Sequence, residues 1–207
     1  MKKLLTGLTL AALAAAAHAD LKDDFERFIE GSYGGAALGV ESRTTEGCPR
    51  GTTTCEDLRT TPWKFWGGWR VSETLGTEIS YIHYGTLRSQ TIGAYSLPAG
   101  ETRTRAQSIG LSFAPTFAIN QVSSVVARLG VASVKTEYDS PTESNGDWRA
   151  EPLLGAALQW HVGRSLPEAV GILRGFSLEF GWDTTRIKQV DRKKWIHLFT
   201  IGGGMEF

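Results

Sequence analysis

The chain has 207 residues, with 22 basic and 22 acidic side chains, so its formal net charge is zero. Nothing in this balance indicates a nucleic-acid partner, because such binding requires a basic, clustered charge. Mean hydropathy is −0.17, and past Asp20 no apolar run reaches the ~20 residues that a membrane helix needs.

The first nineteen residues predict a secretory signal peptide. Two lysines start it, an apolar stretch begins at Leu4, and Ala17-His18-Ala19 has the small-x-small form of a cleavage site. The apolar stretch is too short for a retained membrane helix and runs directly into acidic residues. We therefore expect a cleaved signal peptide over 1–19 and a single exported domain over 20–207.

The exported part contains eight segments with period-two alternation, which is the pattern of β-strands. They lie near 32–42, 61–71, 75–85, 103–117, 124–137, 148–161, 172–183 and 195–207.

Alternation gives each segment one apolar and one polar or small face. In the second segment the apolar face carries Trp63, Phe65, Gly67, Trp69 and Val71. In the fourth segment it carries Ile109, Leu111, Phe113, Pro115 and Phe117, and in the last it carries Phe199, Ile201, Gly203, Met205 and Phe207. The opposite faces suit the narrow interior of an eight-stranded barrel.

The connections alternate in length. Turns at 72–74 and 120–121 are short, as on the periplasmic side of a membrane barrel, whereas four connections are long and polar, as on the extracellular side. The long ones are 43–60, 86–102, 138–147 and 184–194. The connection at 162–171 is long for a periplasmic turn, and we expect a short helix or an extended hairpin there.

These features predict an all-β fold, an eight-stranded antiparallel up-and-down transmembrane β-barrel. Such strands alternate between lipid and interior, so mean hydropathy stays low. The 24 glycines and the aromatic residues at segment ends agree with this architecture. We expect a monomer in the outer membrane of a Gram-negative cell, in contact with its lipid and lipopolysaccharide.

The first long connection contains the only two cysteines, Cys48 and Cys55. At an oxidising cell surface such a close pair predicts a disulfide. A metal site is the alternative, but the residues between them offer no further ligand of the usual kind.

Charged residues occupy inward positions of the predicted strands. Burying an unpaired charge costs several kcal/mol, so these residues should pair with one another. We expect Arg128 within pairing reach of Glu78 or Glu179. The predicted interior set is Lys64, Arg70, Glu78, Arg128 and Glu179, with Glu41 as a further candidate.

The rim of the extracellular side is rich in cations that could contact lipopolysaccharide phosphates, above all Arg192, Lys193 and Lys194. Other basic residues of this rim are Arg103, Arg105, Arg149, Arg186 and Lys188. The acids Glu101, Glu143, Asp147, Asp183 and Asp191 are expected on the same rim. They lie close enough to cancel part of the positive charge, and an ordinary mixed-charge rim is the alternative.

Nothing in the sequence assembles a catalytic site. The histidines of the exported part are His83, His161 and His197, and no compact His/Ser/acid motif accompanies them. The glycine run 202–204 lies inside a strand pattern with no helix behind it, so it is not a phosphate loop. We expect no catalytic residues, no cofactor and no metal.

The chain resembles the OmpA-like eight-stranded transmembrane domains over nearly all of its exported part. The similarity begins with Trp66-Gly67-Gly68-Trp69-Arg70-Val71 and Leu75-Gly76-Thr77-Glu78-Ile79-Ser80-Tyr81, which look like the family's turn-and-strand hairpin. In matching order follow Arg128-Leu129-Gly130, Glu151-Pro152-Leu153, Leu158-Gln159-Trp160 and Leu178-Glu179-Phe180.

The resemblance implies further roles. The ending of the chain looks like the signal that outer-membrane assembly machinery recognises, carried by Thr200, Gly202, Met205 and Phe207. The periplasmic peptidoglycan-binding domain of larger members is expected to be absent.

Some members of the family open a passage for ions by exchanging interior ion-pair partners. Glu78 matches a carboxylate of that gate, but Ala114 and Ser177 stand where its basic partners would be, and Gln159 replaces a second carboxylate. The sequence therefore departs from the gating pattern.

Three functions follow as hypotheses. The first is a structural or surface-interaction barrel that presents its outer loops, and the second is a narrow pore. The third is an enzyme that modifies lipid A, which would require a nucleophile beside a base. The first is preferred.

Overall fold

The computed structural model describes residues 31–44, 52–58, 60–91, 100–139, 144–165, 175–189 and 192–207. Within these ranges, no helix has the length and apolar character needed to cross a membrane. The predicted signal peptide and its cleavage site lie outside the described residues, and so do Cys48, Glu143 and Asp191.

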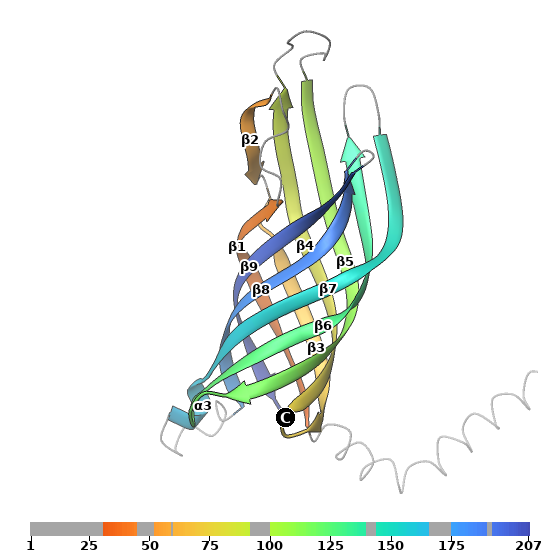
Figure 1. Ribbon diagram of the computed structural model, residues 1–207. Helices are drawn as coiled ribbons and strands as arrows, with labels where there is room; N and C mark the ends of the chain where they lie inside the picture. Colours follow the sequence, from red (N-terminus) through yellow and green to blue (C-terminus); the bar gives the residue numbers. More distant parts are fainter. Residues whose placement is uncertain are drawn as a thin grey trace, which may run out of the picture.

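Eight antiparallel strands form a closed ring in up-and-down order, which confirms the predicted fold class (Figure 1). Sequence neighbours pair with each other, and β1 closes the ring by pairing with both β3 and β9. The ring strands are β1 Ser32–Thr44, β3 Trp63–Ser72, β4 Leu75–Thr91, β5 Gly100–Ala118, β6 Ser123–Asp139, β7 Ser144–His161, β8 Phe176–Gln189 and β9 Arg192–Glu206.

The two ends of the barrel differ. At the lower end in Figure 1, β3 passes to β4 through a turn at 73–74, and β5 passes to β6 through bends at 119–122. The 162–171 connection begins with a short helix, α3 Val162–Ser165, and residues 166–174 are outside the described part. At the upper end the strands of β4–β5 and β6–β7 extend far beyond their neighbours (Figure 1).

The strands at the upper end are longer than predicted, and one strand was not predicted at all. Much of 86–102, 138–147 and 184–194 is strand rather than loop. The additional strand β2, Thr52–Leu58, lies within 43–60 and pairs with the upper part of β4. Few residues of these upper segments are apolar, so the alternation that revealed the lower strands disappears from the sequence there.

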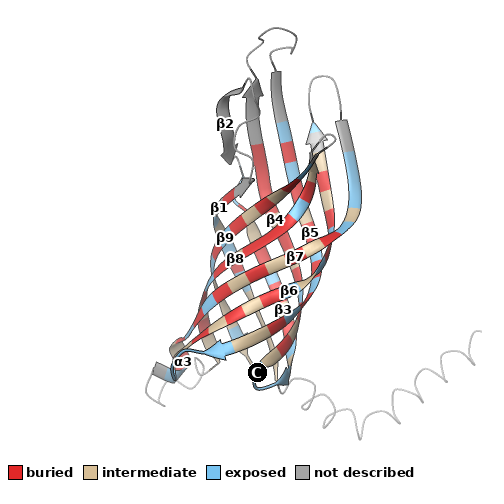
Figure 2. Cartoon of the chain, viewed as in Figure 1, coloured by how far each residue is buried: buried red, intermediate tan, exposed pale blue. Residues whose placement is uncertain are grey.

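Burial follows the predicted alternation along each ring strand (Figure 2). Side chains predicted to face outward are strongly exposed, with Phe65 at 54%, Leu111 at 58% and Ile201 at 46%. Their inward neighbours Lys64, Ser112 and Thr200 are at most 4% exposed. A ring of large exposed apolar side chains is untenable in water and is the surface that a bilayer covers.

Aromatic residues border this belt at its upper edge. Trp63 contacts Tyr81 with ring centroids 5.0 Å apart, and it stacks on His83 at 5.7 Å. Between β8 and β9, Trp182 stacks on His197 with ring centroids 5.8 Å apart. His83 and His197 are therefore both part of an interfacial aromatic layer.

Candidate functional site

The lower half of the barrel interior is held by a buried charge cluster. Arg128 on β6 lies between two carboxylates: its Nε is 2.6 Å from Glu78 on β4, and its Nη2 is 2.9 Å from Glu179 on β8. All three side chains are at most 1% exposed. Three strands far apart in the sequence are thereby joined across the barrel.

Neutral side chains add two hydrogen bonds to this cluster. The Tyr33 hydroxyl donates to Glu78 at 3.2 Å, and the Gln159 amide donates to Glu179 at 3.1 Å. Gly76 makes room for Tyr33, because a Cβ there would come within 2.5 Å of the tyrosine oxygen. The small inward residues predicted from the sequence thus accommodate the large buried ones.

A second ion pair lies beside the first. Lys64 Nζ on β3 is 2.7 Å from Asp183 on β8, and both side chains are at most 1% exposed. We expected Asp183 on the outer rim, and that expectation is wrong: its position on β8 faces the interior, because β8 extends six residues further than predicted. The interior cluster therefore has three carboxylates and two cations.

Trp66 connects the two ion pairs. Lys64 Nζ lies 5.3 Å from the centroid of its ring, and the Arg128 guanidinium carbon lies 5.8 Å from it. Stacking on an aromatic face stabilises a desolvated cation. Alternation with the outward residues Phe65 and Gly67 predicts that Trp66 faces inward, but only the three-dimensional arrangement reveals this role.

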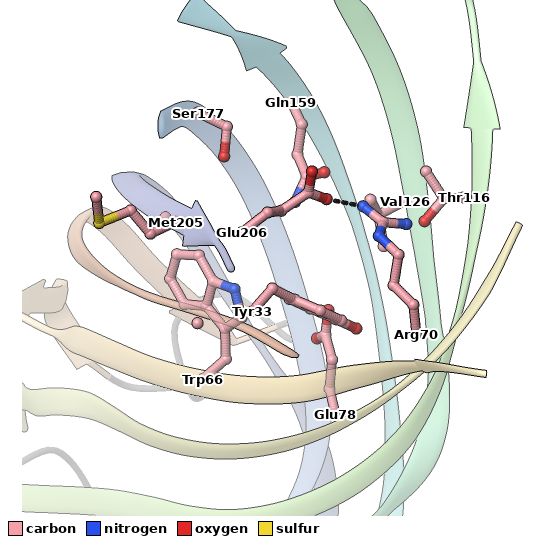
Figure 3. Close-up of a pocket in the computed structure, with 12 residues that line it drawn as sticks. Tyr33, Trp66, Arg70, Glu78, Thr116, Val126, Gln159, Ser177, Met205 and Glu206 are labelled. Atoms are coloured by element: carbon pink, nitrogen blue, oxygen red, sulfur yellow. Dashed lines mark hydrogen bonds and ion pairs between the residues drawn. The ribbon is translucent and has the colours of Figure 1, made fainter. Parts of the chain in front are cut away.

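The lower mouth of the barrel is occupied by a third ion pair. Arg70 pairs with Glu206, and Figure 3 shows the two side chains joined next to Tyr33 and Glu78. The cavity that they line has room for about one water molecule, ≈ 10 Å³. Strand alternation predicted both Arg70 and Glu206 on inward faces, but it did not predict that they pair. The Glu41 side chain is outside the described part.

Above the charges, the interior contains a buried apolar layer, which the sequence analysis did not predict. It is formed by Ile82, Tyr84, Leu87, Ala106, Ala132, Val134, Leu153, Ile187, Ile196 and Leu198. Small and polar side chains such as Thr104, Ser108 and Thr185 are buried beside it, so the predicted interior is correct in part. Within this layer β4 has a bulge at Gly85, whose φ of +82° favours glycine.

The side chains predicted to contact lipopolysaccharide do not all lie on the outer surface. Lys194 points into the barrel and is 8% exposed. Lys193 Nζ lies 2.7 Å from Glu151, and the Arg192 side chain is outside the described part. The three cations therefore do not form the outward cluster expected from their spacing.

One histidine lies within hydrogen-bond distance of a serine. Ser124 Oγ and His161 Nε2 are 3.1 Å apart, both buried at the lower end of β6 and β7. Sequence reasoning missed the pair because 36 residues separate them. Among the described residues no carboxylate hydrogen-bonds to His161, and no group of three His, Cys, Asp or Glu side chains could hold a metal ion.

The end of the chain, which was expected to carry the assembly signal, closes the ring. Thr200 and Gly202 face the interior, whereas Met205 and Phe207 are exposed on the lower outer surface. Gly202 lies against β1, where a Cβ would come within 2.3 Å of the Ala36 carbonyl.

The upper end of the barrel divides into two sheets. The longer sheet consists of β2, β4, β5, β6 and β7, which remain paired up to Thr52–Thr91, Gly100–Thr91 and Asp139–Ser144. The shorter consists of β8, β9 and the end of β1. β7 and β8 separate above the Leu153–Thr185 pair, and Figure 1 shows them diverging.

Comparison with known proteins agrees with this architecture. A family model described as OmpA-like transmembrane domain matches residues 13–203. Among solved structures, Neisserial surface protein A has 15% sequence identity and a TM-score of 0.55, and the match covers 86% of this chain and 98% of that one. This likeness shows the fold.

Two further structures are similar with lower scores. Ail, the attachment invasion locus protein of Yersinia pestis, has 17% identity and a TM-score of 0.47, with 86% of this chain and 99% of that one covered. The N-terminal β-barrel domain of Pseudomonas aeruginosa OprF has 12% identity and a TM-score of 0.47, with 86% and 98% covered. No individual curated protein matches the sequence.

Proposed function

Because the chain belongs to the family of OmpA-like transmembrane domains, we propose that it is a non-conducting outer-membrane barrel that acts through the sheet it extends outside the cell. In membrane barrels short turns face the periplasm and long connections face outward, so the upper end is the extracellular one. The specific role we propose is surface interaction.

The apolar layer carries this proposal. A pore requires a continuous water path, and polar side chains must line it. Here Ile82, Leu153 and Leu198 are at most 1% exposed and pack across the interior directly above the ion pairs. Below them, the lower mouth leaves room for about one water molecule. Both halves of the interior thus support a closed barrel.

The upper sheet supports an outward role. Strands that serve only to span a bilayer need about 10 residues, whereas β5 has 19 and β7 has 18. The additional residues bury little apolar surface and lie beyond the aromatic layer, so membrane insertion does not account for them.

Catalysis has less support. The Ser124–His161 pair places a hydroxyl beside a potential base, which is the first requirement of a nucleophilic mechanism. It lies at the periplasmic end, away from the outer leaflet where lipid A is found, and both side chains are buried.

The proposal is tested by shortening the outer sheet while keeping the barrel. Val134 pairs with Arg149, so replacing residues 135–148 by Asn-Gly joins paired positions through a two-residue turn. A deletion strain expressing this variant should keep an intact envelope but lose the binding to host cells or surfaces that the full chain restores. Heat-modifiable migration on gels verifies that the variant barrel is folded.

Unchanged binding by the shortened variant would show that the outer sheet is not the functional part. The closed interior is tested separately in planar bilayers, where the purified barrel should give no steady conductance. Stable, open single channels in the unmodified protein would support a pore instead.

A further inference from the structure

The upper part of β7 is an edge strand. Its pairing with β6 continues to Ser144, but its pairing with β8 stops at Leu153. The next residue, Pro152, has no N–H to donate to β8. Its carbonyl instead accepts a hydrogen bond from the Thr185 hydroxyl at 2.8 Å. Proline therefore ends the ladder on this side, and among the described residues no strand pairs with the β7 edge above it.

The unpaired edge presents a regular row of backbone groups. In an antiparallel ladder the N–H and C=O of alternate residues point to the same side. Since the Pro152 carbonyl points toward β8, the groups of Ala150, Trp148 and Gly146 point toward the free edge. All three residues are exposed, and such a row is a template for one more strand.

The β8–β9 hairpin stands beside this edge and is basic. Lys193 of the hairpin reaches the β7 edge, where it pairs with Glu151. Lys188 lies directly opposite Lys193 in the ladder, and like charges in such positions are destabilising. The Arg186 guanidinium lies 4.8 Å from the Trp195 ring centroid. An acidic neighbour would relieve this concentration of positive charge.

The described side chains around the edge have excess positive charge. Four are cations and two are acids. The cations are Arg149, Arg186, Lys188 and Lys193, and the acids are Asp147, paired with Arg149 at 3.2 Å, and Glu151. A second copy of the chain would bring the same positive charges together, which disfavours pairing between two such edges.

We infer that the free edge of β7 over residues 146–150 binds an acidic, extended segment of an extracellular protein by β-strand addition. This inference rests on the proposed function, since it names the partner chemistry of the outer sheet. Main-chain hydrogen bonds to the edge would provide affinity, and the basic hairpin would select acidic sequences. The opposite edge of the sheet, on β2, has no comparable basic hairpin among the described residues.

The edge can be tested with one matched pair of variants. The Ala150 N–H points away from β6, so Ala150→Pro removes an edge donor without breaking the β6–β7 ladder. Ala150→Val changes the same position and keeps the donor. The probe is a labelled peptide of alternating threonine and glutamate, measured against the full barrel in nanodiscs of zwitterionic phospholipid.

The peptide should bind the unmodified and Ala150→Val proteins alike and the Ala150→Pro protein about tenfold more weakly. Lys188→Gln should weaken binding severalfold, whereas Arg164→Gln, which removes an exposed cation at the periplasmic end of the barrel, should not. A threonine–lysine peptide should not bind. Should Ala150→Pro fail to fold, N-methylation of alternate peptide amides gives the same test on the unmodified barrel, and one of the two methylation registers should abolish binding.

Equal binding to Ala150→Pro and Ala150→Val, with methylated peptides binding as well as the unmodified one, overturns the inference. The inference is also overturned if the acidic peptide does not bind but lipopolysaccharide raises the unfolding temperature and Lys188→Gln abolishes that rise. The cations would then bind lipid phosphates. Either result leaves the proposed function intact if the shortened-sheet variant still loses surface binding. Retained surface binding by that variant would refute the proposed function itself.

Discussion

Removing Arg128 should destabilise the barrel more than removing any rim cation. The guanidinium contacts Glu78 at 2.6 Å and Glu179 at 2.9 Å, and all three groups are buried. Arg128→Met keeps much of the side-chain volume and leaves two carboxylates without a cation. Breaking a buried ion pair on one side costs about 3–5 kcal/mol. For a domain of this size that corresponds to a fall of roughly 6–20 °C in unfolding temperature.

The measurement is unfolding in detergent micelles by heat and by urea. Lys188→Met serves as the control, because it removes a cation of the upper β8 strand for which the described part shows no ion-pair partner. The deficit of Arg128→Met should shrink when Glu78→Gln and Glu179→Gln are added, because neutral amides need no counter-charge. Equal destabilisation by the two single variants would mean that the interior charges are solvated, and the reasoning would be refuted.

Three further predictions concern other charges and the outer loop. Asp183→Asn and Lys64→Met should each destabilise the barrel, and a double-mutant cycle should show coupling above the ~1 kcal/mol of a surface pair; additive effects would contradict the pair. The two cysteines of the first outer loop should form a disulfide, so an impermeant thiol reagent should label both on whole cells only after reduction. Labelling confined to lysed cells would reverse the assigned orientation. The hydrogen bond from Lys135 at 2.5 Å lowers the pKa of Glu137 on the exposed upper part of β6. The stability that this ion pair contributes is present above the ordinary carboxyl pKa and is lost as the pH falls through the lowered pKa of Glu137. In Lys135→Gln, the pKa of Glu137 measured by NMR should therefore be higher. An unchanged titration curve would exclude the contact.

The lower half of the barrel could be predicted from the sequence because lipid imposes a strict alternation on it. Lys64 and Phe65 are neighbours with opposite environments, at 0% and 54% exposed, and the period-two pattern distinguishes them. The same pattern placed Arg128 inside, and the cost of an unpaired buried charge predicted Glu78 or Glu179 as its partner; the structure has both contacts. The pairing of Lys64 with Asp183 depends on strand stagger around the ring, which the pattern of a single strand does not contain.

The upper half could not be predicted in the same way. Beyond the bilayer neither face of a strand meets lipid, so β2 and the ends of β4 to β7 resemble polar loops in sequence. Asp183 was misplaced for this reason, since the predicted end of its strand lay at that residue. The apolar interior layer was missed because Ile82, Leu153 and Leu198 were not weighed as inward positions, although their alternation with outward neighbours is visible once the strand ends are known.

The seam between β1 and β9 has a consequence for how the barrel forms. Every other ring contact joins strands adjacent in the chain, whereas this one pairs Ala36 with Gly203 and Tyr33 with Glu206. The entropic cost of closing a loop rises with its length, and contacts between distant residues form slowly. The seven hairpin contacts can therefore assemble as an open, curved sheet while the first and last strands remain unpaired. Until that seam closes, each of these two strands has a free hydrogen-bonding edge, so the folding intermediate is a structure that other β-strands can capture.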